Sequence, residues 1–398
     1  MGDLISRNCP VCGQSNNELL FHQMFKNIIG IPHKSFKQEI VICSNCGMVY
    51  VDNFLSDVDI EKYYTAMSNY EYSEDSYEYH NAYKERSKRQ VKYILSHTNA
   101  QAGSVLDIGC SVGYTLHLLK KKGFNVLGND PSPACSKIAK QKYGVNVHVG
   151  FFEKTTYKKQ KFDFIILSHV IEHLKYPLSF FSEIKTVLNK GGMVFIEIPC
   201  TDLFDERDIC QFFFEHINYF SAKSLLNMMS NAGYKQLDSV VFENSPLISP
   251  YYPTLGSLWV QNKERINKPI KSSYKADKEK IKNYVNLINS FANSLEKKIN
   301  NILKQHKKIG IWCAGTLTAM LLAQTKLLEA DIVAIFDNDP KKDGQKMSNI
   351  PVIKPKLVVE TFKDKIEAII IGSWSSQEEI YHSINFLDKS DIKIYKLF

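Results

Sequence analysis

The sequence predicts an α/β protein built from three folded units, and three observations support this fold class. Two Cys-x-x-Cys pairs near the N-terminus indicate a small metal-binding unit, and two later regions each alternate short apolar strands with amphipathic helices. Strands that alternate with helices are typical of a parallel sheet covered by helices on both faces. A chain of 398 residues is also too long for one ordinary hydrophobic core, which agrees with several domains.

The first unit, residues 1–70, carries the segments "NCPVCG" and "VICSNCGMV". Two residues between the cysteines let both thiolates bind one ion, and the glycine that follows lets the chain turn. Four thiolates complete a tetrahedral Zn²⁺ site without an open position, so we expect a structural zinc rather than a catalytic one. Four free thiols or a redox-active pair are the alternative interpretation. The expected zinc ligands are Cys9, Cys12, Cys43 and Cys46.

The second unit, residues 71–245, begins within a polar, tyrosine-rich stretch. Residues 55–100 have apolar side chains at helical spacing, and their tyrosines either line a ligand cleft or pack between domains. From residue 103 onward, short apolar strands alternate with helices. This alternation predicts a doubly wound parallel sheet.

A ligand-binding loop is expected at the first strand–turn–helix of this unit, "VLDIGCSVGYTL". Gly109 and Gly113 let the backbone approach a ligand and expose N–H groups at the start of the helix. Asp107 would attract an ammonium group and repel a pyrophosphate. The second strand ends at Asp130, about twenty residues downstream, where a carboxylate can accept the hydroxyl groups of a ribose. The same aspartate could instead cap the next helix.

The spacing Asp-x-Gly-x-x-x-Gly resembles that of class I S-adenosylmethionine (SAM) methyltransferases. The resemblance implies a Rossmann-like fold in which SAM is held by Asp107, Gly109, Gly113 and Asp130. It places the adenine after the third strand, in "VHVGFFEK", and assigns the turn "SHVIEHL" to the end of the fourth. Phe152 and His169 are therefore further candidate SAM-binding residues, although both could serve only in packing. A nicotinamide dehydrogenase is disfavoured because the G-x-G-x-x-G pattern is missing.

The third unit follows a connector. Residues 262–307 are rich in Lys, Asn and Ser with apolar residues at helical spacing, so we expect a helical connector, to which we assign residues 246–307. Residues 308–398 then repeat the strand–turn–helix pattern and predict a smaller Rossmann-like α/β domain. Its loop "GIWCAGTLT" lacks a dinucleotide fingerprint. The domain is expected either to help form a substrate cleft or to act as a structural lid.

A candidate catalytic pair lies in the aromatic segment "CQFFFEHINYFS". His216 titrates near neutral pH and could act as a base, with the adjacent Glu215 orienting it. A single histidine among aromatic residues is more often a core residue. The position of His216 just after the fifth strand of a SAM-binding fold favours the catalytic interpretation.

The whole chain resembles the three-domain sugar C-methyltransferases, which methylate C3 of nucleotide-linked 4-keto-deoxysugars. The resemblance is carried by "CPVC", "CSNC", "LDIGCSVG", "EIP", "EHINYFS", "FDNDPKKDGQ" and "GSW". It implies that His216 removes a proton next to the ketone or positions the enolate. The family has a tyrosine three residues before this histidine, whereas this chain has Phe213.

The sequence therefore predicts a SAM-dependent methyltransferase that methylates a carbon of a nucleotide-linked keto-deoxysugar in polysaccharide or natural-product biosynthesis. O- or N-methylation of a sugar nucleotide or another small metabolite is the alternative, because Phe213 lacks the phenol that could contact a sugar. A non-catalytic module that binds SAM or a sugar nucleotide is a third hypothesis.

Charge and composition argue against other partners. The net charge is +8, but the lysines are spread along the chain rather than clustered, so nucleic acid is not an expected partner. No apolar run approaches the roughly 18–20 residues that span a bilayer, and the N-terminus lacks the pattern of a secretory signal. We expect a monomer in the reducing cytoplasm.

Overall fold

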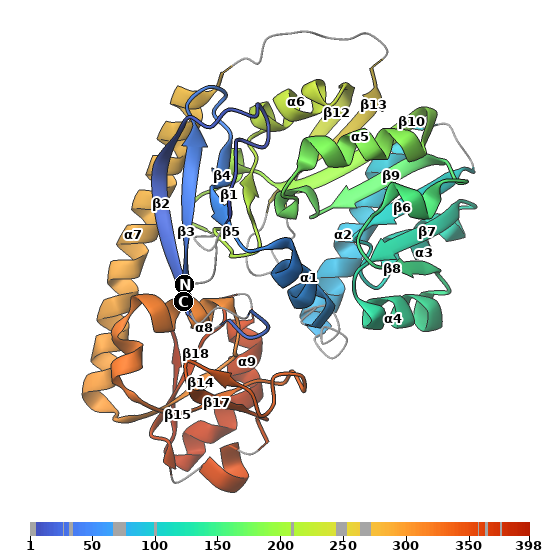
Figure 1. Ribbon diagram of the computed structural model, residues 1–398. Coiled ribbons are helices and arrows are strands. Elements are labelled where there is room, and N and C mark those ends of the chain that lie inside the picture. Colours follow the sequence, from blue (N-terminus) through green and yellow to red (C-terminus); the bar gives the residue numbers. More distant parts are fainter. Residues whose placement is uncertain are drawn as a thin grey trace.

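The computed structural model describes residues 5–26, 28–31, 35–66, 77–98, 102–207, 211–243, 253–262, 272–356, 358–362, 365–374 and 376–398. Cys210, at the start of the predicted aromatic segment, lies outside these residues. The described strands form a central sheet, an N-terminal sheet, a C-terminal sheet and one short strand pair (Figure 1).

The central sheet has the order β12-β13-β10-β9-β6-β7-β8. Its strands β6 to β10 are parallel where they pair, whereas β13 runs antiparallel to both of its neighbours. The strands are β6 (Ser104–Ile108), β7 (Asn125–Asp130), β8 (Val147–Val149), β9 (Phe162–Ser168), β10 (Leu188–Pro199), β12 (Tyr234–Phe242) and β13 (Thr254–Gln261). This arrangement confirms the predicted doubly wound α/β fold.

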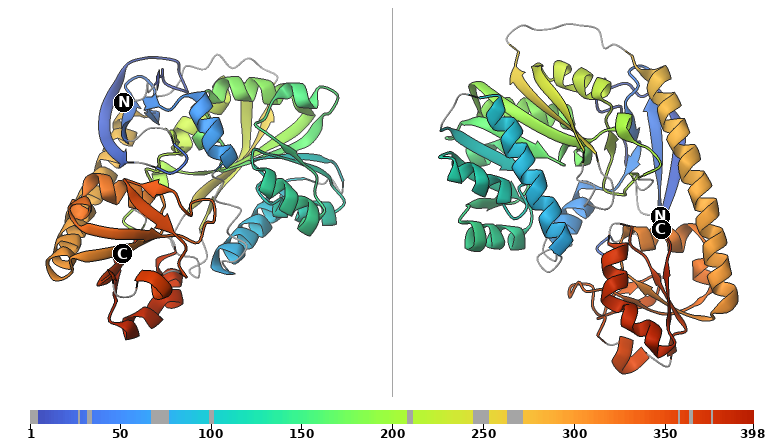
Figure 2. Two further views of the ribbon diagram at one scale, coloured as in Figure 1. Left: turned by 60° about the horizontal axis from the view of Figure 1, so that its bottom comes forward. Right: turned by 180° about the vertical axis from the view of Figure 1, so that it is seen from behind.

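Helices cover both faces of the central sheet. One face packs against α2 (Tyr77–Ser96), α3 (Tyr114–Lys121) and α4 (Pro133–Tyr143). The other packs against α5 (Pro177–Val187) and α6 (Ala222–Asn231). Figure 2 shows α2 lying across its face of the sheet. The short turns η2 (Lys154–Tyr157), η3 (Ile171–His173) and η4 (Thr201–Leu203) follow the strand ends.

Strand β13 differs from the sequence prediction. Residues 254–261 were expected to belong to a helical connector, but they form a strand between β10 and β12. Their run "TLGSLWVQ" is buried on both faces of the sheet, so it lacks the polar–apolar alternation that marks a half-exposed strand. The predicted domain limits at residues 70 and 245 lie outside the described residues, and the limit at residue 307 remains a prediction.

The N-terminal sheet is antiparallel and includes a strand from the middle of the chain. Its order is β11-β4-β3-β2, from β2 (Asn17–Lys26), β3 (Ser35–Cys43), β4 (Val49–Val51) and β11 (Asn218–Tyr219). The strands β1 (Ile5–Ser6) and β5 (Asn53–Phe54) pair beside it, and α1 (Asp57–Ala66) follows. Because β11 begins two residues after His216, the predicted catalytic segment is attached to the N-terminal sheet.

The C-terminal sheet is reached through α7 (Tyr274–Gln305), which runs along the N-terminal sheet (Figure 1). The sheet has the order β16-β17-β15-β14-β18-β19, and its strands are parallel except for β16. The strands are β14 (Lys308–Trp312), β15 (Asp331–Phe336), β16 (Lys346–Met347), β17 (Ile350–Ile353), β18 (Ala368–Ile371) and β19 (Lys393–Lys396). The helices and turns are α8 (Thr316–Gln324), η5 (Lys326–Glu329), η6 (Val358–Phe362), α9 (Gln377–Ile384) and η8 (Asn385–Ser390).

One hydrophobic core joins the N-terminal sheet to the C-terminal domain. It contains side chains of β2, β3, α7, α8 and β14, and it extends to Phe212 and Phe214 beside the candidate site. None of the described helices is long and apolar enough to cross a membrane.

Candidate functional site

The loop after β6 has the geometry expected of a ligand-binding turn. Gly109 and Gly113 have φ values of 74° and 76°, a region that side chains other than glycine rarely adopt. A Cβ atom on Gly109 would lie 2.7 Å from a methyl group of Val170, so this backbone also packs tightly against the segment after β9. Asp107 is buried at the end of β6. Burial, together with the charge of Asp130, raises the pKa of Asp107 well above its usual value.

Asp130 fixes the shape of this loop. Its carboxylate accepts the backbone N–H of Ser111 at 2.8 Å and that of Ser132 at 2.9 Å. The cap of α4 is Ser132, which accepts the N–H of Cys135. Asp130 therefore braces the glycine loop, and the alternative that it caps the helix does not hold.

Phe152 and His169 lie in the segments that follow β8 and β9. The ring of Phe152 stacks on Tyr157, with centroids 5.6 Å apart and planes 12° apart, so one ring face is covered. His169 follows β9 with φ 55°, and its backbone N–H donates to the backbone carbonyl of Glu197. Its Nδ1 lies 3.2 Å from Oε1 of Glu172. His169 thus belongs to a cluster of ionisable groups, and its predicted role in SAM binding stays a prediction.

That cluster is formed by η3 and the segment before β11. The rings of His173 and His216 meet edge to face at 4.9 Å. Ligand atoms of Glu172, His173 and His216 all lie within 4.8 Å of one another. Burial lowers the pKa of His216 to about 3, and the nearby His173 adds to this effect while Glu172 opposes it. His216 is accordingly a neutral imidazole at physiological pH.

Glu215 points away from His216 toward α1. Its Oε1 accepts the hydroxyl of Tyr63 at 2.6 Å. Its backbone carbonyl lies 3.0 Å from Nδ1 of His173, and the Tyr64 hydroxyl lies at the same distance from that nitrogen. Two tyrosines of the predicted tyrosine-rich stretch therefore reach the site.

A cavity of about 560 Å³ opens beside His216. It is lined by β2, the segment 212–216, α7, α8 and the loops after β14 and β18. The walls are strongly aromatic, with Phe213 and His216 on one side and Trp374 of the C-terminal domain among the lining residues. Among the described lining residues, Glu215 and Glu296 are acidic and none is Lys or Arg.

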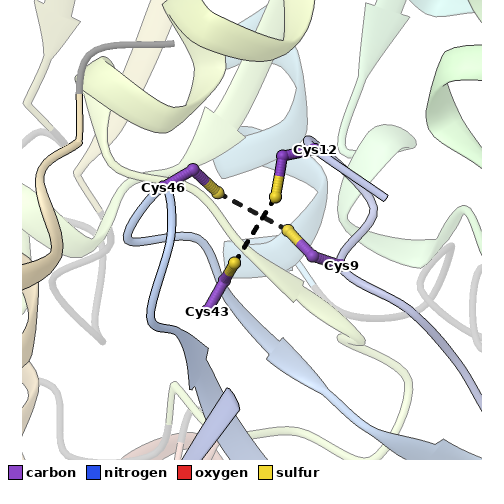
Figure 3. A group of neighbouring side chains, drawn as sticks. All are labelled: Cys9, Cys12, Cys43 and Cys46. Carbon is purple, nitrogen blue, oxygen red and sulfur yellow. Dashed lines mark hydrogen bonds between the residues drawn. The ribbon is translucent and has the colours of Figure 1, made fainter. Parts of the chain in front are cut away.

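The four predicted zinc ligands come together on two turns (Figure 3). The Sγ atoms of Cys9 and Cys46 are 3.5 Å apart, and those of Cys12 and Cys43 are 3.4 Å apart. Each turn closes with the same bond, in which the N–H of Gly13 or Gly47 donates to the first cysteine of its pair at 2.9 Å. Four convergent thiols fit Zn²⁺, for which Zn–S bonds of roughly 2.3 Å place the sulfurs a little under 4 Å apart.

Sequence reasoning missed Glu172, His173, Tyr63 and Tyr64 as parts of the site. Glu172 and His173 stood in the quoted turn "SHVIEHL", and the tyrosines stood in a stretch with no fixed motif. Spacing along the chain gave no sign that these segments meet, because the contact depends on how β11 joins the N-terminal sheet.

Two family models match most of the described chain. Residues 79–239 match a methyltransferase domain, and residues 261–395 match a C-methyltransferase C-terminal domain. The first match covers the central sheet as far as β12, and the second covers α7 and the C-terminal sheet.

Similar proteins include a carboxymethyltransferase and an O-methyltransferase. The chain is 33% identical to tRNA U34 carboxymethyltransferase of Campylobacter curvus and 29% identical to ubiquinone biosynthesis O-methyltransferase of Coxiella burnetii. These alignments cover 28% and 27% of this chain, and 39% and 47% of the relatives. An uncharacterized protein of Methanocaldococcus jannaschii is 29% identical over 38% of this chain and 72% of its own length.

A methyltransferase is also found among the similar solved structures, at low sequence identity. Magnesium protoporphyrin IX methyltransferase from Synechocystis, with bound SAM, aligns to 52% of this chain and 98% of its own, with 14% identity and a TM-score of 0.40. The two family matches confirm the predicted enzyme class. The chain thus contains a SAM-dependent methyltransferase domain that is followed by a C-methyltransferase C-terminal domain.

Proposed function

We propose that this protein transfers the methyl group of SAM to a carbon atom next to the ketone of a nucleotide-linked keto-deoxysugar. The observation that carries the proposal is the cavity beside His216, because the C-methyltransferase C-terminal domain supplies part of its wall. Asp107, Asp130 and the loop containing Gly109 and Gly113 would hold SAM, with Phe152 and His169 at its edges.

Methyl transfer to carbon needs a carbanion-like centre. A base must remove the proton next to the ketone, and donors must stabilise the enolate while the carbon attacks the methyl group of the sulfonium. His216 is the proposed base. Its neutral form has a free lone pair, and its ring lines the cavity. Glu215 was expected to orient His216, but its carboxylate accepts a hydrogen bond from Tyr63. We therefore propose that Glu215 holds part of the cavity wall in place instead.

The C-terminal domain contributes the start of α8 to the same cavity. Gly315 and Thr316 lie there, and exposed N–H groups at a helix N-terminus favour anions such as phosphate. This geometry supports a nucleotide-linked substrate.

A second candidate function is O-methylation of an uncharged, aromatic-rich acceptor. It is favoured by Phe213, a phenyl ring in van der Waals range of His216 at a centroid distance of 5.2 Å, and by the absence of Lys or Arg among the described lining residues. A base and an aligned methyl group are sufficient for such a transfer.

Deuterium exchange separates the two candidates. The purified protein would be incubated in D₂O with SAH and a thymidine diphosphate-linked 4-keto-2,6-dideoxyhexose, and mass spectrometry would follow exchange at the carbons next to the ketone. C-methylation predicts exchange with SAH and a methyl–carbon product with SAM. His216→Asn should reduce both by about 100-fold or more while SAH still binds. Methyl transfer without exchange would reject C-methylation in favour of the O-methyl alternative.

The zinc site has its own test. Protein purified without added metal should contain about one Zn²⁺ per chain, because a closed four-thiolate site binds tightly. Cys9→Ser with Cys46→Ser should lose the metal, and Cys135→Ser, a cysteine in the methyltransferase domain, should keep it. A stable wild-type protein without metal would reject the zinc proposal.

A further inference from the structure

Glu172 is a buried carboxylate surrounded by imidazoles. Only 1% of its surface is exposed, and its Oε1 lies 3.2 Å from Nδ1 of His169 and 3.9 Å from Nε2 of His173. A ring nitrogen of His216 lies within 4.8 Å of a carboxylate oxygen of Glu172 and of a ring nitrogen of His173. A buried carboxylate usually needs a permanent cation such as Arg or Lys beside it. Here the neighbours that favour its charge are His169, His173 and His216, whose own charge depends on a proton.

The positions of these side chains are fixed by backbone contacts. The N–H of Ile217 donates to the carbonyl of Glu172 at 2.9 Å, which ties the segment of His216 to η3. Asn218 donates to the carbonyls of Ile171 at 2.9 Å and Leu174 at 2.7 Å, and Arg7 donates to the Asn218 side chain. The distance between Glu172 and His216 is therefore set by the fold.

We propose that Glu172 is the positioning residue that stabilises the proton accepted by His216, so that Glu172, His169, His173 and His216 hold this proton as one buried cluster. The inference rests on the proposed function, because it concerns the proton removed from the substrate carbon. When the C–H bond breaks, its electron pair stays on the enolate and the proton moves to a ring nitrogen of His216. The enolate then displaces SAH from the methyl group, and the proton later leaves to solvent.

The charge of the cluster supports this role. Burial alone would raise the pKa of Glu172, but the close contact with His169 and the charges of the nearby histidines outweigh it and lower the pKa to about 2. Glu172 is therefore ionised and His216 neutral before the reaction, and one added proton converts His216 into the cation that faces the carboxylate. A proton taken up here gains a buried counter-ion without any movement of the backbone.

The test compares two Glu→Gln variants, with the same sugar nucleotide as acceptor. Glu172→Gln should lower kcat and the exchange of the acidic hydrogen by about 100-fold, a usual contribution of acid–base groups, with KM and SAH affinity within about 3-fold of wild type. Glu215→Gln makes the same chemical change at the residue before His216 in the chain, where the carboxylate contacts Tyr63. It should lower kcat by less than about 10-fold. Glu172→Asp keeps the charge and should recover part of the lost rate.

The pH profile distinguishes this role from a structural one. The ionisable groups facing His216 are Glu172 and His173 of η3 and His169 after β9, whereas the carboxylate of the adjacent Glu215 is held by Tyr63. Because Glu172 raises the pKa of His216, Glu172→Gln should move the acid limb of kcat/KM to lower pH as well as lower the maximum. A loss of rate with an unmoved limb, or equal losses in the two Gln variants, would overturn the proposal.

Two further results keep the inference separate from the proposed function. If wild-type protein transfers methyl groups without deuterium exchange, C-methylation fails, while the ratio of the Glu172→Gln and Glu215→Gln rates still measures the role of Glu172. A second metal ion per chain that is lost in Glu172→Gln but kept in Cys9→Ser would overturn the inference, since His216 would then be a ligand. If Glu172→Gln does not fold, the rate and pH limb of Glu172→Asp decide the question.

Discussion

In the methyltransferase domain and in the C-terminal domain, an aspartate after a strand accepts two backbone N–H groups, but the charges around the two aspartates differ. In the first, Asp130 at the end of β7 accepts the N–H groups of Ser111 and Ser132, at 2.8 and 2.9 Å. In the second, Asp337 just after β15 accepts those of Ala314 and Asp339, at 2.7 and 2.8 Å. Asp130 thus holds the loop after β6 and the turn after β7, and Asp337 holds the loop after β14 and the turn after β15.

The surroundings of the two aspartates differ in charge. Asp130 lies close enough to the buried Asp107 to raise the pKa of that carboxyl, so the loop carries negative charge that a cationic ligand can balance. Asp337 lies 3.1 Å from Nζ of Lys342, whose side chain is only 12% exposed, and β14 contains no acidic residue. The same loop geometry is thus open to a cationic ligand such as SAM in one domain and neutralised internally in the other.

The largest expected effect comes from Asp337. Asp337→Asn leaves the largely covered Lys342 with only the more distant Asp339, at 4.0 Å, so the free energy of unfolding should fall by about 3 kcal/mol. The dissociation constant for SAH should stay within about 2-fold of wild type, because Lys342 already neutralises the Asp337 loop, which leaves no need for a cationic ligand there. Urea unfolding and calorimetric titration with SAH measure the two quantities.

A double variant controls for the charge of Lys342. Asp337→Asn with Lys342→Met removes both charges and should recover most of the lost stability, since an apolar side chain can replace a buried ion pair at little cost. An Asp337→Asn protein that is stable but has lost SAH binding would show that the C-terminal loop takes part in cofactor binding, and the contrast between the domains would fail.

Asp107→Asn should have the opposite pair of effects. Removing one of two neighbouring carboxylates relieves repulsion, so the unliganded protein should gain about 1 kcal/mol of stability. SAH carries the ammonium that this carboxylate is proposed to bind, so its dissociation constant should rise by about 100-fold. Unchanged SAH affinity in this variant would remove Asp107 from the proposed cofactor site.

The contrast between the two loops also shows what the sequence could and could not predict. The glycine spacing correctly predicted a turn at Gly109 and Gly113 after the strand that carries Asp107, because positive φ values and close backbone approach select glycine locally. The paired Cys-x-x-Cys-Gly turns were recognisable for the same reason. Local backbone geometry leaves a pattern in the sequence.

Contacts between distant segments leave no such pattern. Strand β13 was missed because a run buried on both faces has no alternation, and Glu172 was missed as the partner of His216 because the two meet only through β11. Adjacent residues in the chain suggested Glu215 instead. The side chain of Glu215 is instead directed toward Tyr63.

The smallest expected effect is a pH dependence that belongs to the first loop. The folded-state pKa of Asp107 is raised above the roughly 3.9 of an unfolded chain, so the folded protein binds more protons between these two values. The free energy of unfolding of the SAM-free protein should therefore be highest below the unfolded pKa and fall as pH rises through the folded one, by at most about 1.4 kcal/mol per pH unit. Urea unfolding of wild type and Asp107→Asn at a series of pH values isolates this slope, which the variant should lack. Saturating SAH should flatten the wild-type slope, because the ligand's ammonium favours the ionised carboxylate; equal slopes in both proteins would mean that another group carries the dependence.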